Sequence, residues 1–283
     1  MKPEKGKQMQ QRKLLFERRA LELSPADSPF WYTSGTFGPY YINTHYLMGG
    51  EEVAKEALVL LDDPSPDNLV AFYRIVKDHL QNDEAYAELM SSLAEDYHDY
   101  AVISGGARRD FFFSFAIAEI LAKPHLALLK EGRSFLLQDE SCAEIPADQI
   151  LEGPVLHVAD LLTAGSSYIR AWIPMLKKHG LDLKETLIMV NRDQEGTEIL
   201  RQAGVQVHAP LTLDGAFFKQ AQEEGYLSDH QLSRILEFWR DPELYMHSFI
   251  KDHPDFIDQA LSSDAKTKER AERFISQRKD KDR

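Results

Sequence analysis

Cysteine is almost absent from this chain, which has 283 residues and Cys142 as its single thiol. One cysteine excludes an internal disulfide and a zinc site built from cysteines. Long apolar runs are missing too, since none approaches the ~20 residues that span a bilayer. The charged N-terminus, Met1 to Arg19, has no apolar signal-peptide core. We therefore expect a cytoplasmic protein with no membrane partner.

Positive charge is also scarce, because 33 Lys and Arg face 46 Asp and Glu and leave a net charge of -13. Such a balance argues against general nucleic-acid binding, which needs basic surfaces. It does not exclude a small anionic ligand, because a local pocket can be positive in an acidic protein. The hydrophobic content of 43% is enough for one large domain with additions, or for two small domains.

The most informative stretch runs from Val155 to Ser167 and reads Val-Leu-His-Val-Ala-Asp-Leu-Leu-Thr-Ala-Gly-Ser-Ser. Its apolar start predicts a strand at 155–158, and a helical pattern follows from about Tyr168 to His179. Free backbone N–H groups and the helix dipole make such a helix start a favourable place for a phosphate. Asp160 would lie where α/β sheets place ligand-binding side chains. The alternative is a buried strand followed by an ordinary Asp or Ser helix cap.

The middle of the chain alternates between strand and helix patterns, which predicts βαβ units and a mostly parallel sheet. The expected strands are 100–104, 125–130, 155–158, 187–190 and 205–210. The expected helices are 111–121, 168–179 and 196–202, with a loop at 105–110 and an irregular loop from 131 to Gly153. Beyond Leu213 the pattern is helical only.

The N-terminal part of the chain does not show this alternation of strand and helix patterns. Residues 1–24 predict an amphipathic helix that stops at Ser24-Pro25. The aromatic segment from Phe30 to Tyr46 predicts two short strands, and 51–62 and 66–97 predict helices.

The Val155–Ser167 segment resembles the phosphoribosyl-pyrophosphate (PRPP) motif of type I phosphoribosyltransferases. That motif has four apolar residues, two acids, two apolar residues and then a Thr-Thr/Ala-Gly-Gly/Ser/Thr turn. In this chain the first acid is replaced by Ala159, and only the second, Asp160, is present.

Further segments are similar, in the same order, to the orotate phosphoribosyltransferase branch of that family. They are Tyr32–Asn43, Val102–Asp110, Lys123–Lys130, Val190–Gly196 and Gly204–Leu213. The resemblance covers residues 28–215, which form the expected phosphoribosyltransferase-like domain with a helical insertion at about 50–98. An N-terminal helix at 1–27 precedes this domain, and a helical C-terminal extension at 216–283 follows it. It implies an α/β fold of the type I phosphoribosyltransferase kind, with a mostly parallel sheet flanked by helices.

The resemblance also implies the function and its residues. We expect transfer of phosphoribosyl from PRPP to a pyrimidine base, in a homodimer, with Mg²⁺ held by PRPP rather than directly and with Asp160 nearest the ion. The implied catalytic residues are Asp160, Arg109 and Lys130. The implied 5′-phosphate site is Thr163, Ala164, Gly165, Ser166 and Ser167, and the implied pyrophosphate site is Gly105, Gly106, Arg108 and Arg109. Tyr40, Tyr41 and Arg192 are implied for the base.

Plainer interpretations remain open for several of these residues. Arg108 and Arg109 could form surface ion pairs, worth little energetically. Tyr40 and Tyr41 could pack in a core, and Arg192 could serve a structural turn. His157, inside an apolar strand, is expected to be a satisfied core residue, and no histidine pair has convincing metal-ligand spacing.

The departures from the family pattern leave two functional hypotheses. The family's catalytic loop runs Lys-x-x-Lys-x-His-Gly, whereas this chain reads Lys130-Glu131-Gly132-Arg133-Ser134. Arg133 is then a candidate substitute for the missing lysine. Thr33 stands where the family has a Lys before Ser-Gly, and the acid pair is reduced to Asp160. The first hypothesis is an orotate phosphoribosyltransferase-like enzyme; the second is a non-catalytic or regulatory homologue that binds PRPP or a nucleotide.

Overall fold

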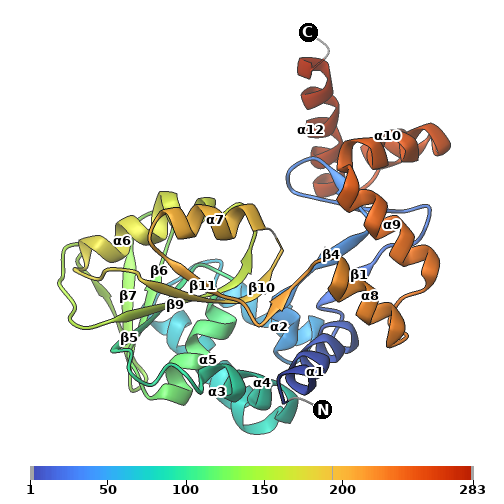
Figure 1. Ribbon diagram of the computed structural model, residues 1–283. Coiled ribbons are helices and arrows are strands. Elements are labelled where there is room, and N and C mark those ends of the chain that lie inside the picture. Colours follow the sequence, from blue (N-terminus) through green and yellow to red (C-terminus); the bar gives the residue numbers. More distant parts are fainter. Residues whose placement is uncertain (1–2, 193, 282–283) are drawn as a thin grey trace. The chain divides into compact units, whose positions relative to one another are not determined.

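The computed structural model describes residues 3–192 and 194–281, and they form two compact units (Figure 1). The first unit contains the chain up to Ala20 and then Asn43–Asp214. The second contains Leu21–Ile42 and the described residues from Gly215 onward. The segment from 21 to 42 thus belongs with the C-terminal helices, while the domain ranges expected from the sequence stay a prediction.

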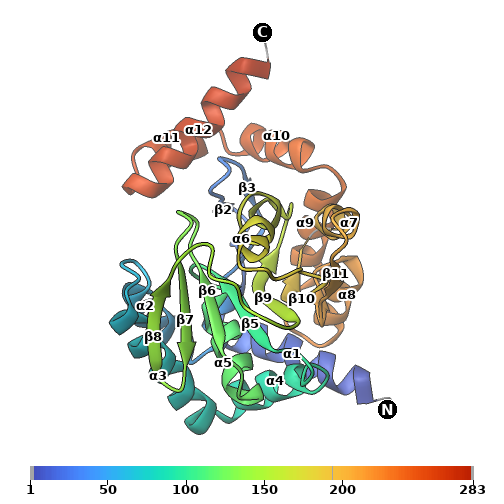
Figure 2. The same cartoon turned by 90° about the vertical axis from the view of Figure 1, so that its left-hand side faces the viewer.

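A mixed sheet forms the centre of the first unit. Its strands are β5 (Val102–Gly106), β6 (His125–Leu128), β7 (Ser134–Gln138), β8 (Ser141–Ile145), β9 (Val155–Leu162), β10 (Glu185–Asn191), β11 (Gln206–His208) and β12 (Leu211–Thr212). They lie in the order β11-β10-β9-β5-β6-β7-β8, as Figure 2 shows, with β12 also paired to β10. Pairing is parallel from β11 to β6 and antiparallel at β7 and β8. The expected mostly parallel α/β sheet is confirmed.

Helices cover both faces of this sheet (Figure 1). Helix α5 (Phe111–Leu121) is apolar almost throughout and is buried against β5, β6 and β9. On the other face, α6 (Ile173–Lys178) and α7 (Gln194–Gln202) close a core that contains Val155, Leu176 and Leu200. Because both faces are covered, the central strands read as nearly continuous apolar runs.

The N-terminal helices of the first unit are shorter than the sequence predicts. Helix α1 spans Pro3–Glu17, so the predicted helix at 1–24 is too long, and residues 21–23 form a strand instead. Next come η1 (Thr44–Leu47), α2 (Glu51–Leu60), α3 (Pro66–Asn82) and α4 (Glu84–Ala94). The predicted helix 66–97 is divided because Asp83 caps α4, accepting the N–H of Tyr86, and pairs with Arg18 at 2.5 Å.

The segment from 131 to 153, predicted to be an irregular loop, contains β7 and β8. Asp139 and Glu140 make the turn between them, and both have positive φ. Neither is a glycine, the residue type from which such a turn is usually predicted. Strand β8 is largely exposed, with Ile145 as its single buried residue. A polar edge strand of this kind lacks the apolar alternation on which the sequence prediction relied.

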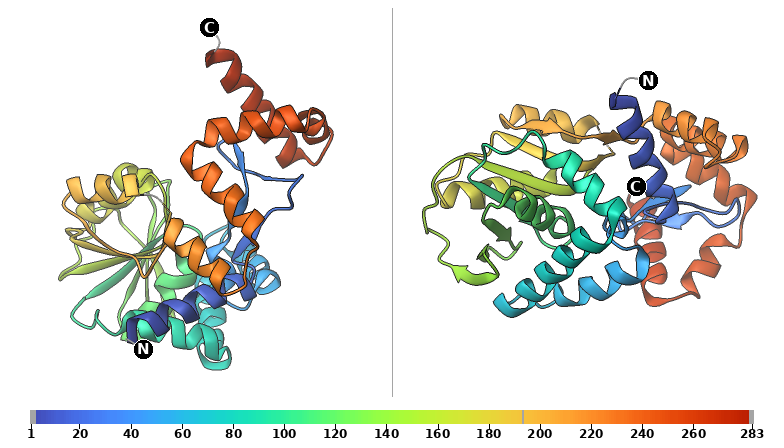
Figure 3. Two further views of the ribbon diagram at one scale, coloured as in Figure 1. Left: turned by 45° about the vertical axis from the view of Figure 1, so that its right-hand side comes forward. Right: turned by 90° about the horizontal axis from the view of Figure 1, so that it is seen from below.

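Aromatic side chains hold the second unit together. Its strands are β1 (Leu21–Leu23), β2 (Phe30–Trp31), β3 (Phe37–Gly38) and β4 (Tyr40–Ile42). Its helices are α8 (Gly215–Glu223), α9 (Asp229–Arg240), α10 (Pro242–Asp252), α11 (Phe256–Leu261) and α12 (Ala265–Lys281). The rings of Trp31 and Phe256 are stacked with their centroids 5.2 Å apart, although the two residues are far apart in the sequence. Figure 3 shows the helices of this unit gathered beside its strands.

None of the helices in the described part of the chain is both long and apolar enough to span a membrane.

Candidate functional site

The bend at residues 163–167, called here the 163–167 bend, follows β9 directly. It leads into a continuous helical run from Ser166 to Lys178, in which Tyr168–Trp172 is π-helical (η2). Thr163, Ala164 and Ser166 are exposed. Within the described residues, no backbone carbonyl accepts a hydrogen bond from the N–H groups of this bend. The bend therefore offers several accessible donors at a helix start, which is an arrangement suited to an anion.

Two glycines give the bend its shape. Gly165 has φ +65, a left-handed conformation that glycine adopts without strain. Gly196, in the first turn of α7, lies under the bend so closely that a Cβ there would stand 1.7 Å from the carbonyl oxygen of Thr163. Helix α7 thus supports the bend from below and tolerates no side chain at this position.

Asp160 is half-buried on β9, just before the bend. Thr44 Oγ1, from η1, donates to Asp160 Oδ2 at 2.9 Å. Burial raises the pKa of Asp160, against the opposing influence of hydrogen bonding with Asp110 and of the charge of Arg109. The structure therefore brings Asp160, Arg109 and the bend to one edge of the sheet.

Three residues of this neighbourhood were missed by the sequence reasoning: Thr44, His45 and Asp110. Burial, reinforced by the charges of Arg109 and Arg108, lowers the pKa of His45 to about 3, so its imidazole is neutral. Burial, reinforced by the charge of Asp160, raises the pKa of Asp110 well above its usual range. No local motif singles out these residues, because their contacts with Asp160 or Arg109 join distant parts of the chain.

The residues predicted to bind pyrophosphate separate into two kinds. Gly105 and Gly106 are buried in β5 rather than in a loop, so the predicted loop at 105–110 begins too early. A Cβ on Gly106 would stand 2.3 Å from the Trp172 ring, so this glycine is required by packing. Its N–H donates to Asp110 Oδ2 at 3.1 Å. The Gly106 amide is therefore already used within the protein.

The two arginines of this segment also differ from each other. Arg108 is exposed and forms an ion pair with Asp62, from the segment between α2 and α3. Arg109 is half-buried, and no carboxylate among the described side chains lies within ion-pair distance of it. Arg109 is thus the better placed of the two to meet an anionic ligand.

The segment that matches the family's catalytic loop is a tight hairpin. The N–H of Leu129 donates to the Arg133 carbonyl at 3.0 Å, and β6 pairs with β7 immediately on either side. Lys130 is exposed at its start. Arg133 forms a two-pronged pair with Glu144, its Nε and Nη2 at 3.0 and 2.8 Å. The hairpin is too short to supply a long mobile loop.

The residues predicted to hold the base lie in different units. Tyr40 belongs to the second unit, where it is 2% exposed, packs against Phe218 and receives a hydrogen bond from Trp239. Core packing, the alternative left open for it, describes its environment. Tyr41 is half-buried in the same unit, and Arg192 is half-buried after β10 in the first. The base-binding role of these residues stays a prediction.

His157 is fully buried, as expected for a core residue, and burial lowers its pKa to about 3. Its Nδ1 lies 3.0 Å from Ser104 Oγ, but its Nε2 has no hydrogen-bond partner among the described residues. That Nε2 stands 4.0 Å from Asp110 Oδ2. The imidazole is therefore satisfied on one side only.

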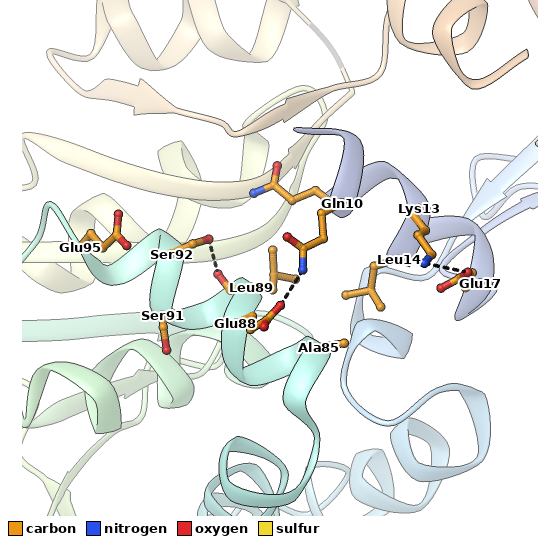
Figure 4. Close-up of a pocket in the computed structure, with 11 residues that line it drawn as sticks. Gln10, Lys13, Leu14, Glu17, Ala85, Glu88, Leu89, Ser91, Ser92 and Glu95 are labelled. Carbon is orange, nitrogen blue, oxygen red and sulfur yellow. Dashed lines mark hydrogen bonds and ion pairs between the residues drawn. The ribbon is translucent and has the colours of Figure 1, made fainter. Parts of the chain in front are cut away.

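A cavity of about 500 Å³ lies elsewhere in the first unit, between α1 and α4 (Figure 4). Its lining includes Leu14, Leu89 and Glu88, and Glu88 accepts a hydrogen bond from Gln10 at 2.6 Å. The residues that line this cavity include none of those predicted for the site.

The chain is similar to known phosphoribosyltransferases. It is 32% identical to an adenine phosphoribosyltransferase of Actinobacillus succinogenes over 143 residues, which cover 46% of this chain and 77% of that protein. No protein-family model matches the chain.

Among solved structures, Leishmania donovani UMP synthase aligns with a TM-score of 0.52 and 14% identity, covering 81% of this chain. The alignment spans 41% of the length of that protein. An orotate phosphoribosyltransferase of Aeropyrum pernix aligns with a TM-score of 0.45 and 21% identity, over 75% of this chain and 99% of the other.

Proposed function

This chain belongs to the type I phosphoribosyltransferase family, and we propose that it transfers phosphoribosyl from PRPP to a pyrimidine base, with orotate as the base we favour. The observation that carries the proposal is the exposed 163–167 bend, which follows Asp160 at the end of β9. A 5′-phosphate bound at this bend would bring the ribose hydroxyls toward Asp160.

In the proposed reaction the bond from ribose C1 to pyrophosphate breaks, and a ring nitrogen of the base forms the new bond to C1 as its proton is lost to the departing pyrophosphate or to water. Positive charge develops on the ribose as pyrophosphate leaves with the electron pair. Asp160 supplies negative potential near that charge, and Arg109 supplies donors for the departing pyrophosphate. The protein's main contribution is to hold the two reactants in position.

We propose that Mg²⁺ enters this site with PRPP. Among the described residues, no group of three or more His, Cys, Asp or Glu could hold a metal ion alone. Mg²⁺ is suited to one or two carboxylates together with substrate phosphates, and Asp160 fits that arrangement as the protein oxygen nearest the ion. The ion would neutralise charge on the departing pyrophosphate.

The choice of base rests on the segment from Tyr32 to Asn43, which is similar to the base-holding segment of orotate phosphoribosyltransferases. Adenine is the competing base, because the relative at 32% identity is an adenine phosphoribosyltransferase. We further propose a cytoplasmic homodimer, on the family resemblance.

The second candidate function is a non-catalytic homologue that binds PRPP or a nucleotide. The tight hairpin from Leu129 to Arg133 favours it, because this hairpin lacks both the second Lys and the His-Gly of the family's loop. Loss of those groups would remove transition-state stabilisation and leave ground-state binding in place.

Incubating the protein with PRPP, Mg²⁺ and either orotate or adenine separates these functions. Our proposal predicts that orotate absorbance falls, that a nucleotide product appears, and that Asp160→Ala stops both. Turnover of adenine alone would assign the other base. PRPP binding without turnover of either base would establish the second candidate, and absence of PRPP binding would contradict both.

A further inference from the structure

A carboxylate outside the PRPP motif lies against Asp160. Asp110, which precedes α5, is 9% exposed. Its Oδ1 accepts a hydrogen bond from the backbone N–H of Asp160 at 2.9 Å, and its Oδ2 accepts one from the N–H of Gly106 at 3.1 Å. One buried side chain therefore binds the backbone of two strands.

These two contacts lie beyond the ladder that joins the strands. The parallel pairing of β5 with β9 ends at Ser104 and His157. Past that point the carboxylate of Asp110 holds Gly106 and Asp160 at a fixed separation. Asp110 thus sets the geometry at the strand ends where the proposed PRPP site lies.

The usual structural role of an Asp before a helix does not explain this residue. Such an Asp normally accepts a hydrogen bond from the first turn of its own helix. Asp110 makes no such bond with α5. Its oxygens are directed to the sheet instead.

Ala159, which stands where the motif has its first acid, has no polar side-chain group and is buried in the core. Ala159 is 3% exposed and belongs to the core that contains Trp172 and Tyr168. The remaining acid, Asp160, is held through its carboxylate by Thr44 and through its backbone by Asp110.

We propose that Asp110 is a positioning residue for PRPP binding: from outside the motif, its side chain orders the site in which Ala159 replaces the first motif acid. By fixing Asp160 and the Gly106 end of β5 relative to each other, it makes the ribose and the pyrophosphate bind as one unit. This inference rests on the proposed function, since it assumes that PRPP is the ligand.

The test compares binding of PRPP with Mg²⁺ and binding of inorganic phosphate, by calorimetry, in the full chain and in Asp110→Asn. The matched control is Asp83→Asn, because Asp83 is another carboxylate that accepts two backbone N–H groups, those of Gly49 and Tyr86. We expect Asp110→Asn to weaken PRPP binding about tenfold, the order expected when one buried hydrogen bond that orders the site is lost, and to change phosphate binding less than about twofold. Asp83→Asn should lower the melting temperature and leave both affinities unchanged.

Equal PRPP affinities for Asp110→Asn and Asp83→Asn would overturn the inference and leave the proposed function standing. A wild-type chain that binds neither PRPP nor phosphate would contradict the proposed function itself. If Asp110→Asn does not fold, Asp110→Ser, which keeps an oxygen acceptor in a smaller side chain, carries the same expectation and the same contradicting result.

Discussion

At the 163–167 bend, Thr163, Ala164 and Ser166 are exposed, and no backbone carbonyl of the described residues accepts a hydrogen bond from the N–H groups of the bend. Two arginines predicted for the rest of the site, Arg108 for pyrophosphate and Arg133 as a substitute for the loop lysine, are in a different state. Arg108 is paired with Asp62, and Arg133 is paired with Glu144. The bend is therefore open to an anion, whereas at Arg108 and Arg133 an incoming anion must compete with the protein's own carboxylates.

This difference indicates which part of a PRPP site the chain retains. A preorganised bend binds phosphate without first breaking an internal contact. Arginines that are already paired gain less from a new anion, because the pair must be exchanged. We infer that 5′-phosphate binding contributes more to affinity here than pyrophosphate binding does, with Arg109 as the main cation of the pyrophosphate side.

Gly196→Ala should produce the largest effect, because it breaks the open region. Its new Cβ would stand 1.7 Å from the Thr163 carbonyl oxygen, so the bend must move. Overpacking costs up to ~3 kcal/mol, and we expect phosphate affinity to fall on the order of a hundredfold. Calorimetry with inorganic phosphate measures this. Gly215→Ala is the control, because its Cβ would meet Leu236 at an ordinary 3.7 Å; equal affinities in the two variants would contradict the prediction.

Arg109→Ala tests the other region. Loss of one charge-assisted contact should weaken PRPP binding about tenfold and leave inorganic phosphate binding within about twofold of wild type. The comparison of the two ligands by calorimetry shows whether the effect is confined to pyrophosphate. A parallel loss of phosphate affinity would mean that the two regions are not independent.

Asp62→Ala should strengthen binding, because it frees Arg108 from its ion pair. Both partners are largely exposed, and an exposed ion pair contributes ~0.2–1 kcal/mol. Breaking the pair should therefore raise PRPP affinity by about two- to fivefold at most. Asp63→Ala, its neighbour in the same segment, serves as control. Unchanged or weaker PRPP binding in Asp62→Ala would show that the pair does not compete with the ligand.

Arg133→Ala should have the smallest effect. Since Arg133 is bound to Glu144 in a two-pronged pair on an exposed hairpin, its removal should change PRPP affinity by less than about twofold. A loss comparable to that of Arg109→Ala, measured in the same titration, would return Arg133 to the role of substitute for the family's loop lysine.

The sequence predicted the parts of the fold that follow from local pattern. The bounds of α5 were predicted correctly because a mostly apolar run from Phe111 to Leu121 favours a buried helix. The bend after β9 was placed by the Thr-Ala-Gly-Ser-Ser run. The hairpin of β7 and β8 was missed because its turn residues, Asp139 and Glu140, are not turn glycines and its edge strand is polar.

The site was predictable only where its residues are neighbours in sequence. Asp110 reaches Asp160 across 50 residues, and Thr44 reaches it across 116. Such contacts depend on strand order in the sheet and leave no periodic signal along the chain. The ion pairs of Arg108 and Arg133, which decide how open the pyrophosphate side is, arise in the same way.

A crystal structure of the protein soaked with PRPP and Mg²⁺ tests the central claim most directly. The account predicts the 5′-phosphate within hydrogen-bond distance of backbone N–H groups at Thr163 to Ser167, with the ribose hydroxyls at Asp160. PRPP bound away from the bend, for instance in the cavity between α1 and α4, or an empty bend at saturating PRPP, would contradict it.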